Sequence, residues 1–498
     1  MQVSHALPTA AVASSVDFDE DNLIAHAGLA PALLLALQAG LHDLAGDHLT
    51  LTGPGSANPA AKVTTLVAGM LAGADCIDDM DLLRHGASTK LFEDLRAPST
   101  LGTFLRGFTH GHVRQLDAVA ARFLTGLQTA TTGVGTPLLS LPADAADADQ
   151  LVYVDIDDTI GQTHGYDKEG AAYGYSKVKG LNAMLVTATT AASTPIIVGT
   201  RLRKGSVASA KGAPKLLADS LATLKRTTAA STVASTAADG AAGGGSGVVI
   251  VRADSAYYSH AVVAAAGRAG ARFSITARSN PAVRRAIAGI GEDAWTPIRY
   301  TDAVWDEDDQ RWVSDAEVAE TSYVAFTGRR KAEHVRARLI VRRVKRLNAA
   351  AAAQGQGELF DTYRYHAVFT DSPLAMLAAE KDHRAHAVVE SVIAELKDGA
   401  LAHLPSGKFG ANAAWLVLAA ITHNLARAVA VLAGAGHRRE RVGTIRRKLI
   451  SVPARVASSA RRLRLHAPRG WPWRSGLVNL LGAIGQIARP QPLRTCRT

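Results

Sequence analysis

The spacing of apolar residues divides the chain into a helical first part and a mixed second part. Apolar positions recur at helical intervals and predict helices at residues 31–44, 60–71 and 101–124. Several short helices of this kind fit a helix-turn-helix-like module and fit a plain helical bundle equally well. A stretch rich in Thr, Gly, Pro, Ala and Asp then predicts a boundary at 131–150. We therefore expect a helical N-terminal domain at 1–125 and a linker at 126–150.

Beyond residue 150, short β-rich runs alternate with amphipathic helices. The runs that predict strands are 151–156, 181–187, 194–200, 248–252 and 272–276. Helices are predicted at 214–225 and 259–270, and the Ala/Ser/Thr/Gly-rich segment 229–247 reads as a flexible loop. Three strands, a helix, a strand, a helix and a strand is the order expected of an RNase H-like α/β domain.

The rest of the chain predicts an inserted β-rich segment and two long helices. Val304-Trp305 and Trp312-Val313 flank an acidic turn and predict a hairpin, and 335–341 alternates so that Arg336 and Arg338 share one face. Helices are expected at 374–397 and 415–434, the second buried because His423, Asn424 and Arg427 interrupt its apolar sequence. The fold class is therefore α/β. We expect an RNase H-like mixed sheet at 151–435, with a β insertion at about 290–370.

Composition excludes several classes of protein. Hydrophobic residues make up 47% of the 498 residues and charged residues 20%, so a large core is possible and global disorder is not expected. The two cysteines, Cys76 and Cys496, exclude a disulfide scaffold and a cysteine zinc module, and they fit a reducing cytoplasm. The first 21 residues lack the pattern of a secretory signal. We expect a cytoplasmic protein without a membrane span.

Positive charge is concentrated at the C-terminal end. The whole chain has 55 Lys and Arg against 44 Asp and Glu, a net charge of +11. Residues 437–498 contain fifteen Lys and Arg and one acid, which is +14, so the remainder sums to −3. A near-neutral body with a basic helical tail at 436–498 is typical of proteins that bind nucleic acid, although a solvated tail has the same composition.

Two aspartates lie where strands of the predicted sheet end. Asp157 belongs to Asp155-Ile156-Asp157-Asp158-Thr159 after the first strand, and Asp254 follows the fourth strand. Ligands of α/β sheets bind at the carboxyl ends of strands, and paired carboxylates there suit a hard divalent cation such as magnesium or manganese. Strand alternation places Asp155 and Asp157 on the same face, so either can be the ligand.

A third acid lies on the helix predicted at 374–397. At about 100° per residue, His383, His386, Glu390 and Lys397 share a face about 60° wide, beside a stripe of buried aliphatic residues. Such a polar line can face a cleft at the edge of the sheet, or it can face solvent.

These residues resemble the signature of insertion-sequence DDE transposases. The spacing H-x2-H-x3-E-x6-K at 383–397 is similar to their Y-x2-R-x3-E-x6-K motif, with His383 and His386 in place of the Tyr and Arg. Asp157 and Asp254 match the family's two aspartates, and Glu390 matches its glutamate. The 136 residues from Asp254 to Glu390 leave room for the β insertion of this branch. Over roughly residues 20–435, the sequence resembles members of insertion-sequence family thirteen-eighty.

The resemblance implies a metal-dependent DNA transposase. Its expected activity is strand cleavage and strand transfer at the terminal inverted repeats of its own element, on double-stranded DNA, by a homodimer. Asp157, Asp254 and Glu390 would hold two Mg²⁺ or Mn²⁺ ions, and Lys397 would neutralise a phosphate. The expected DNA contacts are the motif residues and basic residues of the sheet and the tail: Lys397, His386, His383, Lys204, Arg336, Arg338, Arg446, Arg447, Arg461 and Arg462.

Two other interpretations compete with this one. Asp155-x-Asp157-x-Thr159 after an apolar strand also fits the nucleophile motif of haloacid-dehalogenase-like phosphatases, in which Asp155 would accept a phosphoryl group. That interpretation leaves Asp254, the Glu390 helix face and the basic tail unexplained. A catalytically inactive DNA-binding protein derived from a transposase is the second alternative.

Overall fold

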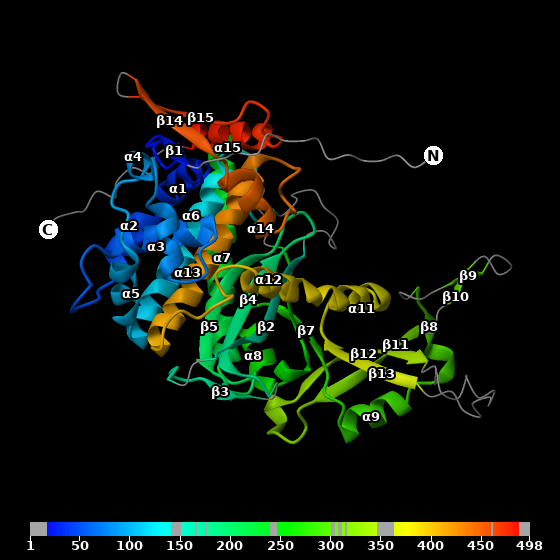
Figure 1. Ribbon diagram of the computed structural model, residues 1–498. Coiled ribbons are helices and arrows are strands. Elements are labelled where there is room, and N and C mark those ends of the chain that lie inside the picture. Colours follow the sequence, from blue (N-terminus) through cyan, green and yellow to red (C-terminus); the bar gives the residue numbers. More distant parts are fainter. Residues whose placement is uncertain are drawn as a thin grey trace, which may run out of the picture.

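The central feature of the protein is a long mixed sheet that carries a helical half on one side (Figure 1). We describe it from a computed structural model. The described residues are 17–140, 151–164, 167–174, 177–239, 247–299, 304–306, 311–313, 316–345, 363–459 and 462–487.

Five strands form the part of the sheet that the sequence predicted. They are β2 (Val152–Gln162), β4 (Lys179–Thr189), β5 (Ile196–Lys204), β6 (Val249–Ala253) and β7 (Arg272–Thr276). In space they run β5-β4-β2-β6-β7. The first three are antiparallel, whereas β2, β6 and β7 are parallel to one another. The helices α7 (Ala213–Asp239) and α8 (His260–Arg268) make the connections, so the predicted order of elements is confirmed.

The inserted strands extend this sheet. A hairpin of β9 (Val304–Asp306) and β10 (Arg311–Val313) forms as predicted. The strands β11 (Ala316–Ala325), β12 (Val335–Lys345) and β13 (Tyr363–Thr370) are antiparallel, and the short β8 (Thr296–Pro297) pairs with β11. Because β13 pairs with β7, the insertion continues the central sheet at its β7 edge. In the sequence, the helix α9 (Pro281–Ala288) follows β7 and precedes the inserted strands.

The helical half is built around one buried helix, α13 (Phe409–Ala433). Helices α3 (Pro59–Ala72), α5 (Pro98–Arg106) and α6 (His110–Thr132) pack against it. By length and composition, helix α13 could cross a membrane, but its apolar stretch is wholly buried inside this fold. Its side chains join a core cluster that continues into the sheet, so the helices and the sheet share one core.

Two predicted helices are broken where the sequence did not indicate a break. The helix expected at 31–44 is α1 (Leu29–Gln38) followed by α2 (Leu41–His48), because Gly40 adopts a φ of 88° that ends the first helix. The helix expected at 101–124 is α5 and α6, because Thr109 caps α6 by accepting a hydrogen bond from the His112 backbone N–H.

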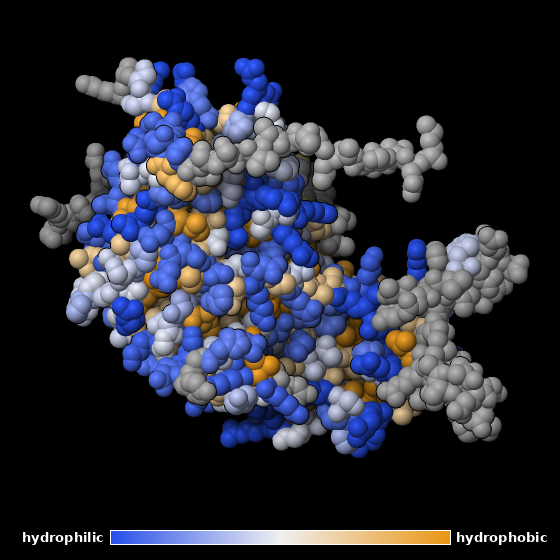
Figure 2. Space-filling model, viewed as in Figure 1, coloured by the Kyte–Doolittle hydropathy of each residue, from blue (hydrophilic) through white to orange (hydrophobic). Residues whose placement is uncertain are grey.

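Two further expectations are wrong. The segment 229–247 was expected to be a loop, but α7 continues to Asp239, which suits its alanine content. The tail was expected to be helical, but it contains α14 (Val442–Ile445), a π turn (Arg446–Ile450), β14 (Ala454–Ser459), β15 (Arg462–His466) and α15 (Arg474–Gln486). Strand β14 pairs with β1 (Leu23–Ile24), which ties the tail to the N-terminal part. Figure 2 shows a mostly hydrophilic surface, with apolar residues in scattered spots.

Candidate active site

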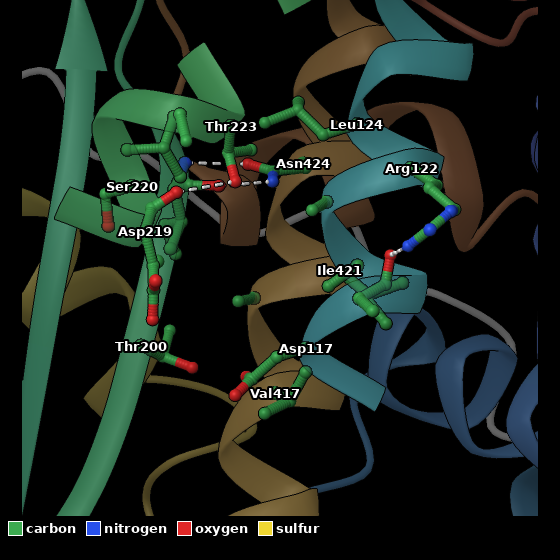
Figure 3. Close-up of a pocket in the computed structure, with 18 of the residues that line it drawn as sticks. Asp117, Arg122, Leu124, Thr200, Asp219, Ser220, Thr223, Val417, Ile421 and Asn424 are labelled. Carbon is green, nitrogen blue, oxygen red and sulfur yellow. Dashed lines mark hydrogen bonds between the residues drawn. The ribbon is translucent and has the colours of Figure 1, made fainter. Parts of the chain in front are cut away.

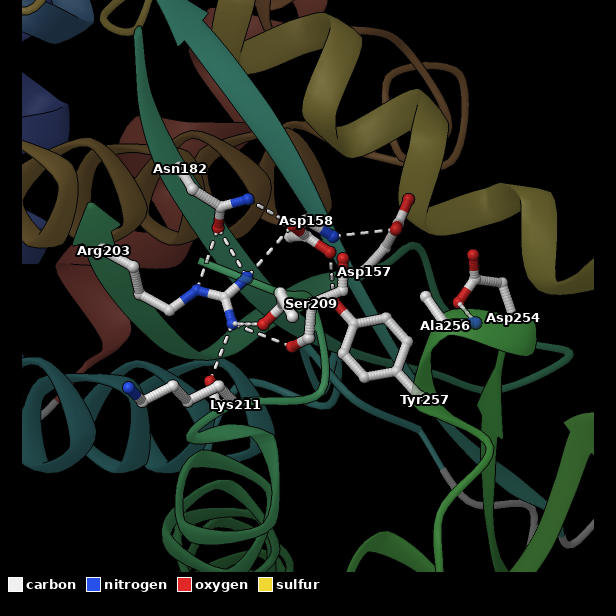
Figure 4. A network of polar contacts seen from close by, with 10 residues as sticks. Asp157, Asp158, Asn182, Arg203, Ser209, Lys211, Asp254, Ala256 and Tyr257 are labelled. Atoms are coloured by element: carbon white, nitrogen blue, oxygen red, sulfur yellow. Dashed lines mark hydrogen bonds and ion pairs between the residues drawn. The ribbon is translucent and has the colours of Figure 1, made fainter. Parts of the chain in front are cut away.

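The pairing of β2 with β6 brings the two predicted aspartates together. The strands are parallel, with Ile156 opposite Ala253, so Asp157 and Asp254 each follow a paired residue on neighbouring strands. Asp254 caps a short 3-10 turn (Ser255–Tyr257) and accepts a hydrogen bond of 2.9 Å from the Ala256 N–H. Both carboxylates point to the side of the sheet that an olive-coloured helix crosses (Figure 4).

The two carboxylates line a half-open cavity of about 1280 Å³. Backbone of the segment 205–209 forms part of its wall, and Arg278, Lys397 and His403 also line it. Burial raises the pKa of Asp157 to about 6, and the charge of Asp254 adds to the effect while His386 opposes it. Burial also raises the pKa of Asp254. No basic side chain of the described residues forms an ion pair with either carboxylate, so two hard oxygen donors with uncompensated charge fit a divalent cation.

Asp155 has a different environment from Asp157. It is fully buried, and its two oxygens accept hydrogen bonds from Arg252 Nε at 2.7 Å and Nη2 at 2.8 Å. His386 Nδ1 lies 3.1 Å from the same carboxylate. Burial alone would raise the pKa of Asp155, but the hydrogen bonds from His386 and Arg252 outweigh it and hold the pKa low. A carboxylate enclosed in this way is out of reach of a substrate phosphate, which argues against the phosphatase interpretation.

Asp158 also lines the cavity, but its side chain points away from Asp157, toward Arg203 (Figure 4). It pairs with Arg203, with 3.0 Å between Arg203 Nη2 and Asp158 Oδ2, and it accepts a 2.6 Å hydrogen bond from the Tyr257 hydroxyl. Asn182 donates to the same carboxylate. Of the three neighbouring acids, Asp157 is therefore the one that lines the cavity without a basic partner among the described residues.

Glu390 lies on a helix that is shorter than predicted. The segment 374–397 is α11 (Met376–Arg384), a 3-10 turn (Ala385–Ala387) and α12 (Val388–Lys397). Lys397 lines the cavity, whereas Glu390 is exposed and is absent from its wall. Seven residues separate the two, which places them on one face of α12.

The structure thus brings two of the three predicted acids together. Among the described residues, one group of three or more His, Cys, Asp or Glu has all ligand atoms within 4.8 Å of one another, and it is Asp75, Cys76 and Asp79. The carboxylate oxygens of Asp157, Asp254 and Glu390 are not all within 4.8 Å of one another.

The two histidines of the motif contact protein. His383 is buried, with Nδ1 3.0 Å from Ser274 Oγ and Nε2 2.9 Å from Thr276 Oγ1. Burial lowers its pKa to about 3, so the ring is neutral at pH 7. Both ring nitrogens are occupied, which leaves none for the DNA contact expected of His383. His386 contacts Asp155, as described above.

The other expected DNA contacts are distributed unevenly. Lys204 is exposed at the end of β5, beside the cavity wall, and Arg336 is exposed on β12. Arg338 is instead held by Glu320 and by the carbonyl oxygens of Ser372 and Leu374.

In the tail, Arg447 and Arg462 are exposed. Arg446 is half-buried beside Gly73 and Gly399, and burial lowers its pKa, so it is not the free surface cation that the sequence suggested. Arg461 lies outside the described residues.

Sequence reasoning missed two parts of the site. Arg278 lines the cavity and donates from Nε to the Ser255 carbonyl at 2.8 Å and from Nη2 to the Ala256 carbonyl at 3.0 Å. Its place two residues after β7 is the same strand-end signal that pointed to the acids. Nothing in the sequence pattern indicated the partners of Asp158, because they come from three distant segments.

A second cavity, of about 360 Å³, lies between α6, α7, β5 and α13 (Figure 3). Asp117 and Asp219 line it, and burial raises the pKa of Asp117 to about 6. Arg114 bridges the two acids, with contacts of 2.7 Å to Asp117 and 2.9 Å to Asp219. Their charge is already compensated, so this cavity is a poorer cation site than the one that contains Asp157.

Comparison with known proteins identifies the family of the chain. The family model described as transposase DDE domain group 1 matches residues 16–489. No curated protein matches the chain. Since the family model spans nearly the whole sequence, the chain belongs to the DDE-domain transposases of this group.

Proposed function

We propose that this transposase cuts and joins DNA in the cavity lined by Asp157 and Asp254, within an RNase H-like domain. The observation that carries the proposal is the pair of acids that two parallel strands bring to one cavity, Asp157 on β2 and Asp254 directly after β6, without a basic partner among the described residues. The five-strand order β5-β4-β2-β6-β7 supports the RNase H-like assignment.

Asp157, Asp254 and Glu390 are the proposed metal ligands. Glu390 is included because it lies on the same face of α12 as Lys397, which lines the cavity. Two Mg²⁺ or Mn²⁺ ions bound there would activate water or a 3′-hydroxyl and stabilise the leaving oxygen of a phosphodiester.

The chain's own residues bind and orient the DNA strand. Lys397 and Arg278 place positive charge at the cavity, where a backbone phosphate would otherwise meet two carboxylates. Arg278 also holds the turn after Asp254 in place through its two carbonyl contacts. The exposed cation Lys204 beside the cavity wall extends the binding surface, and so do Arg336, Arg447 and Arg462 outside the cavity.

The natural substrate that we propose is the pair of terminal inverted repeats of an insertion sequence of family thirteen-eighty. A homodimer would hold the two ends, in the bacterial cytoplasm at the nucleoid. These statements rest on the motif H-x2-H-x3-E-x6-K at 383–397 and on its spacing from the two aspartates.

Cleavage mapping on DNA that carries the element's ends tests the proposal. Strand breaks at the ends should appear with magnesium or manganese and should be absent in excess chelator. Calcium should support binding without efficient cleavage, because its longer and looser coordination misplaces the reacting oxygens.

Point variants identify the ligands. Asp157→Asn, Asp254→Asn and Glu390→Gln should each abolish cleavage while end binding in a band-shift assay stays nearly intact. Asp398→Asn, which removes an exposed carboxylate next to Lys397, is the matched control and should cut normally. Cleavage at the wild-type rate by one of the three variants would exclude that residue as a ligand. Binding without cleavage under every metal condition would favour the inactive DNA-binding alternative.

A further inference from the structure

A buried polar cluster lies beside Asp157 and includes two residues, Asp158 and Asn182, that line the same cavity. It consists of Asp158, Asn182, Arg203 and Tyr257 and is called the Asp158 cluster below (Figure 4). The side chains of Asp158 and Arg203 are 9% and 7% exposed, Asn182 is 3% exposed, and Tyr257 is fully buried. We infer that this cluster is a positioning device that sets the spacing of Asp157 and Asp254 for metal binding. The inference rests on the function proposed above.

The cluster connects the two segments that carry the proposed ligands, the middle of β2 and the turn after β6. Asp158 directly follows Asp157, and Tyr257 is three residues after Asp254. The Tyr257 hydroxyl donates to Asp158 Oδ1 at 2.6 Å, so one hydrogen bond joins the middle of β2 to the turn that Asp254 caps. A shift of that turn relative to β2 would break this bond, and it would also change the distance between the two proposed ligands.

Arg203 connects the same cluster to the cavity wall. Its Nε donates to Asn182 Oδ1 at 2.9 Å, and its Nη2 lies 3.0 Å from Asp158 Oδ2. The Nη1 atom donates to the carbonyl oxygens of Ser209 and Lys211, each at 2.8 Å. The segment 205–209 that lines the cavity is therefore held by the guanidinium that also holds Asp158.

Stability alone does not account for such a cluster. Removing two charges from water costs much of what their attraction returns, so an apolar cluster of the same volume would serve a core as well. The cluster instead supplies directional contacts to three segments that border the cavity. Residues that orient metal ligands in this way typically change metal affinity when they are replaced.

Removal of the Tyr257 hydroxyl tests the inference. The full-length protein is titrated with Mn²⁺ without DNA, and bound metal is followed by electron paramagnetic resonance. Tyr257→Phe should raise the Mn²⁺ dissociation constant about tenfold or more. It should also lower the cleavage rate without changing affinity for end DNA in calcium.

Tyr258→Phe is the matched control, since the neighbouring hydroxyl bonds to Tyr323 and has no contact with the cluster. It should bind Mn²⁺ like the wild type. Asn182→Ser, which keeps the Arg203–Asp158 pair, provides a second variant in case Tyr257→Phe folds poorly by circular dichroism. It should weaken Mn²⁺ binding in the same direction.

Equal Mn²⁺ affinity in the wild type and in a folded Tyr257→Phe protein would overturn the inference, and so would equal losses in Tyr257→Phe and Tyr258→Phe. A different result identifies failure of the proposed function. If Asp157→Asn binds Mn²⁺ as the wild type does, the metal site itself is wrong, and the positioning role falls with it.

Discussion

Three aspartates within four residues of β2 have three different environments. Asp155 is enclosed with Arg252 and His386. Asp157 and Asp158 both line the cavity, but Asp158 is paired with Arg203 whereas Asp157 has no basic partner among the described residues. Alternation along the strand predicts that Asp155 and Asp157 share a face, but it does not predict which of them is covered. Arg252 determines that Asp155 is the covered acid, because strand register places Arg252 opposite Asp155.

The Asp155–Arg252 pair predicts the effect of a single substitution. Asp155→Asn leaves the Arg252 guanidinium buried without its counter-charge, and breaking a buried pair in this way costs about 3 kcal/mol or more. We expect the free energy of unfolding, measured with urea, to fall by that order. Residual cleavage per folded molecule should remain, because Asp155 does not reach the cavity. A fully stable Asp155→Asn protein would show that the pair contributes little.

The raised pKa of Asp157 predicts a pH dependence of the metal-free protein. Its folded pKa of about 6 lies above the unfolded value, so the folded state binds the extra proton between about pH 4 and 6. Stability should therefore decrease as the pH rises through that range and stay lower above it. Asp157→Asn removes the penalty and should stabilise the metal-free protein at pH 7.5 by on the order of 2 kcal/mol.

Thermal melts at two pH values check this prediction. The stabilising effect of Asp157→Asn should be present at pH 7.5 and small at pH 4, where wild-type Asp157 is protonated in the folded state and about half protonated in the unfolded state. Added Mg²⁺ should raise the melting temperature of the wild type more than that of the variant. A variant that is less stable than the wild type at pH 7.5 would contradict the assignment of an uncompensated charge.

At the scale of elements, periodicity predicted which segments form strands and helices, but tertiary contacts set their limits. The first strand was predicted to end at residue 156 but continues to Gln162, because its polar second half pairs with residues 180–185 of β4. The helix predicted at 374–397 contains a 3-10 turn at Ala385–Ala387. Its polar face was predicted from the sequence. The burial of His383 was not, because Ser274 and Thr276 lie more than 100 residues away.

His383 connects α11 to β7 through its contacts with Ser274 and Thr276. Its burial predicts a second pH effect. Burial lowers the pKa of His383 to about 3, so in acid the unfolded state binds a proton that the folded state does not. Stability should fall as the pH drops below about 6.5, and this residue should account for about 2 kcal/mol of the loss by pH 5.

His383→Gln keeps polar contacts to the two hydroxyls but does not titrate, so that part of the acid sensitivity should disappear. Urea unfolding at pH 7.5 and pH 5 measures the difference. DNA affinity in a band-shift assay should change little, in contrast to the contact that the motif alone suggested. An unchanged pH dependence in the variant would show that another group is responsible.

At the scale of the whole molecule, the tail is part of the fold. Strand β14 pairs with β1 and α15 packs on α13, so residues from both ends of the chain cover the helical half. Ala454 and Val456 face a small apolar cluster with Ile24, Ala27 and Ala87. The cross-strand pairs Arg455–His466 and Ser459–Arg462 place basic side chains on the other face of the hairpin. Truncation of the tail would therefore remove core contacts as well as charge.

Charge reversal on the hairpin tests the tail as a DNA-binding surface without cutting it. Arg462 and Arg464 are exposed and are two residues apart on β15, so they share the basic face. If both contact phosphates, each contributes about −0.9 to the slope of log affinity against log salt concentration. Arg462→Glu/Arg464→Glu should then flatten the slope by about 2 and weaken binding to specific and nonspecific DNA by similar factors, because phosphate contacts carry no sequence information.

Lys215→Glu/Lys225→Glu, which reverses two exposed charges on α7, is the matched control for net charge. A hairpin variant that melts like the wild type and keeps its salt slope would show that this face of the tail does not bind DNA.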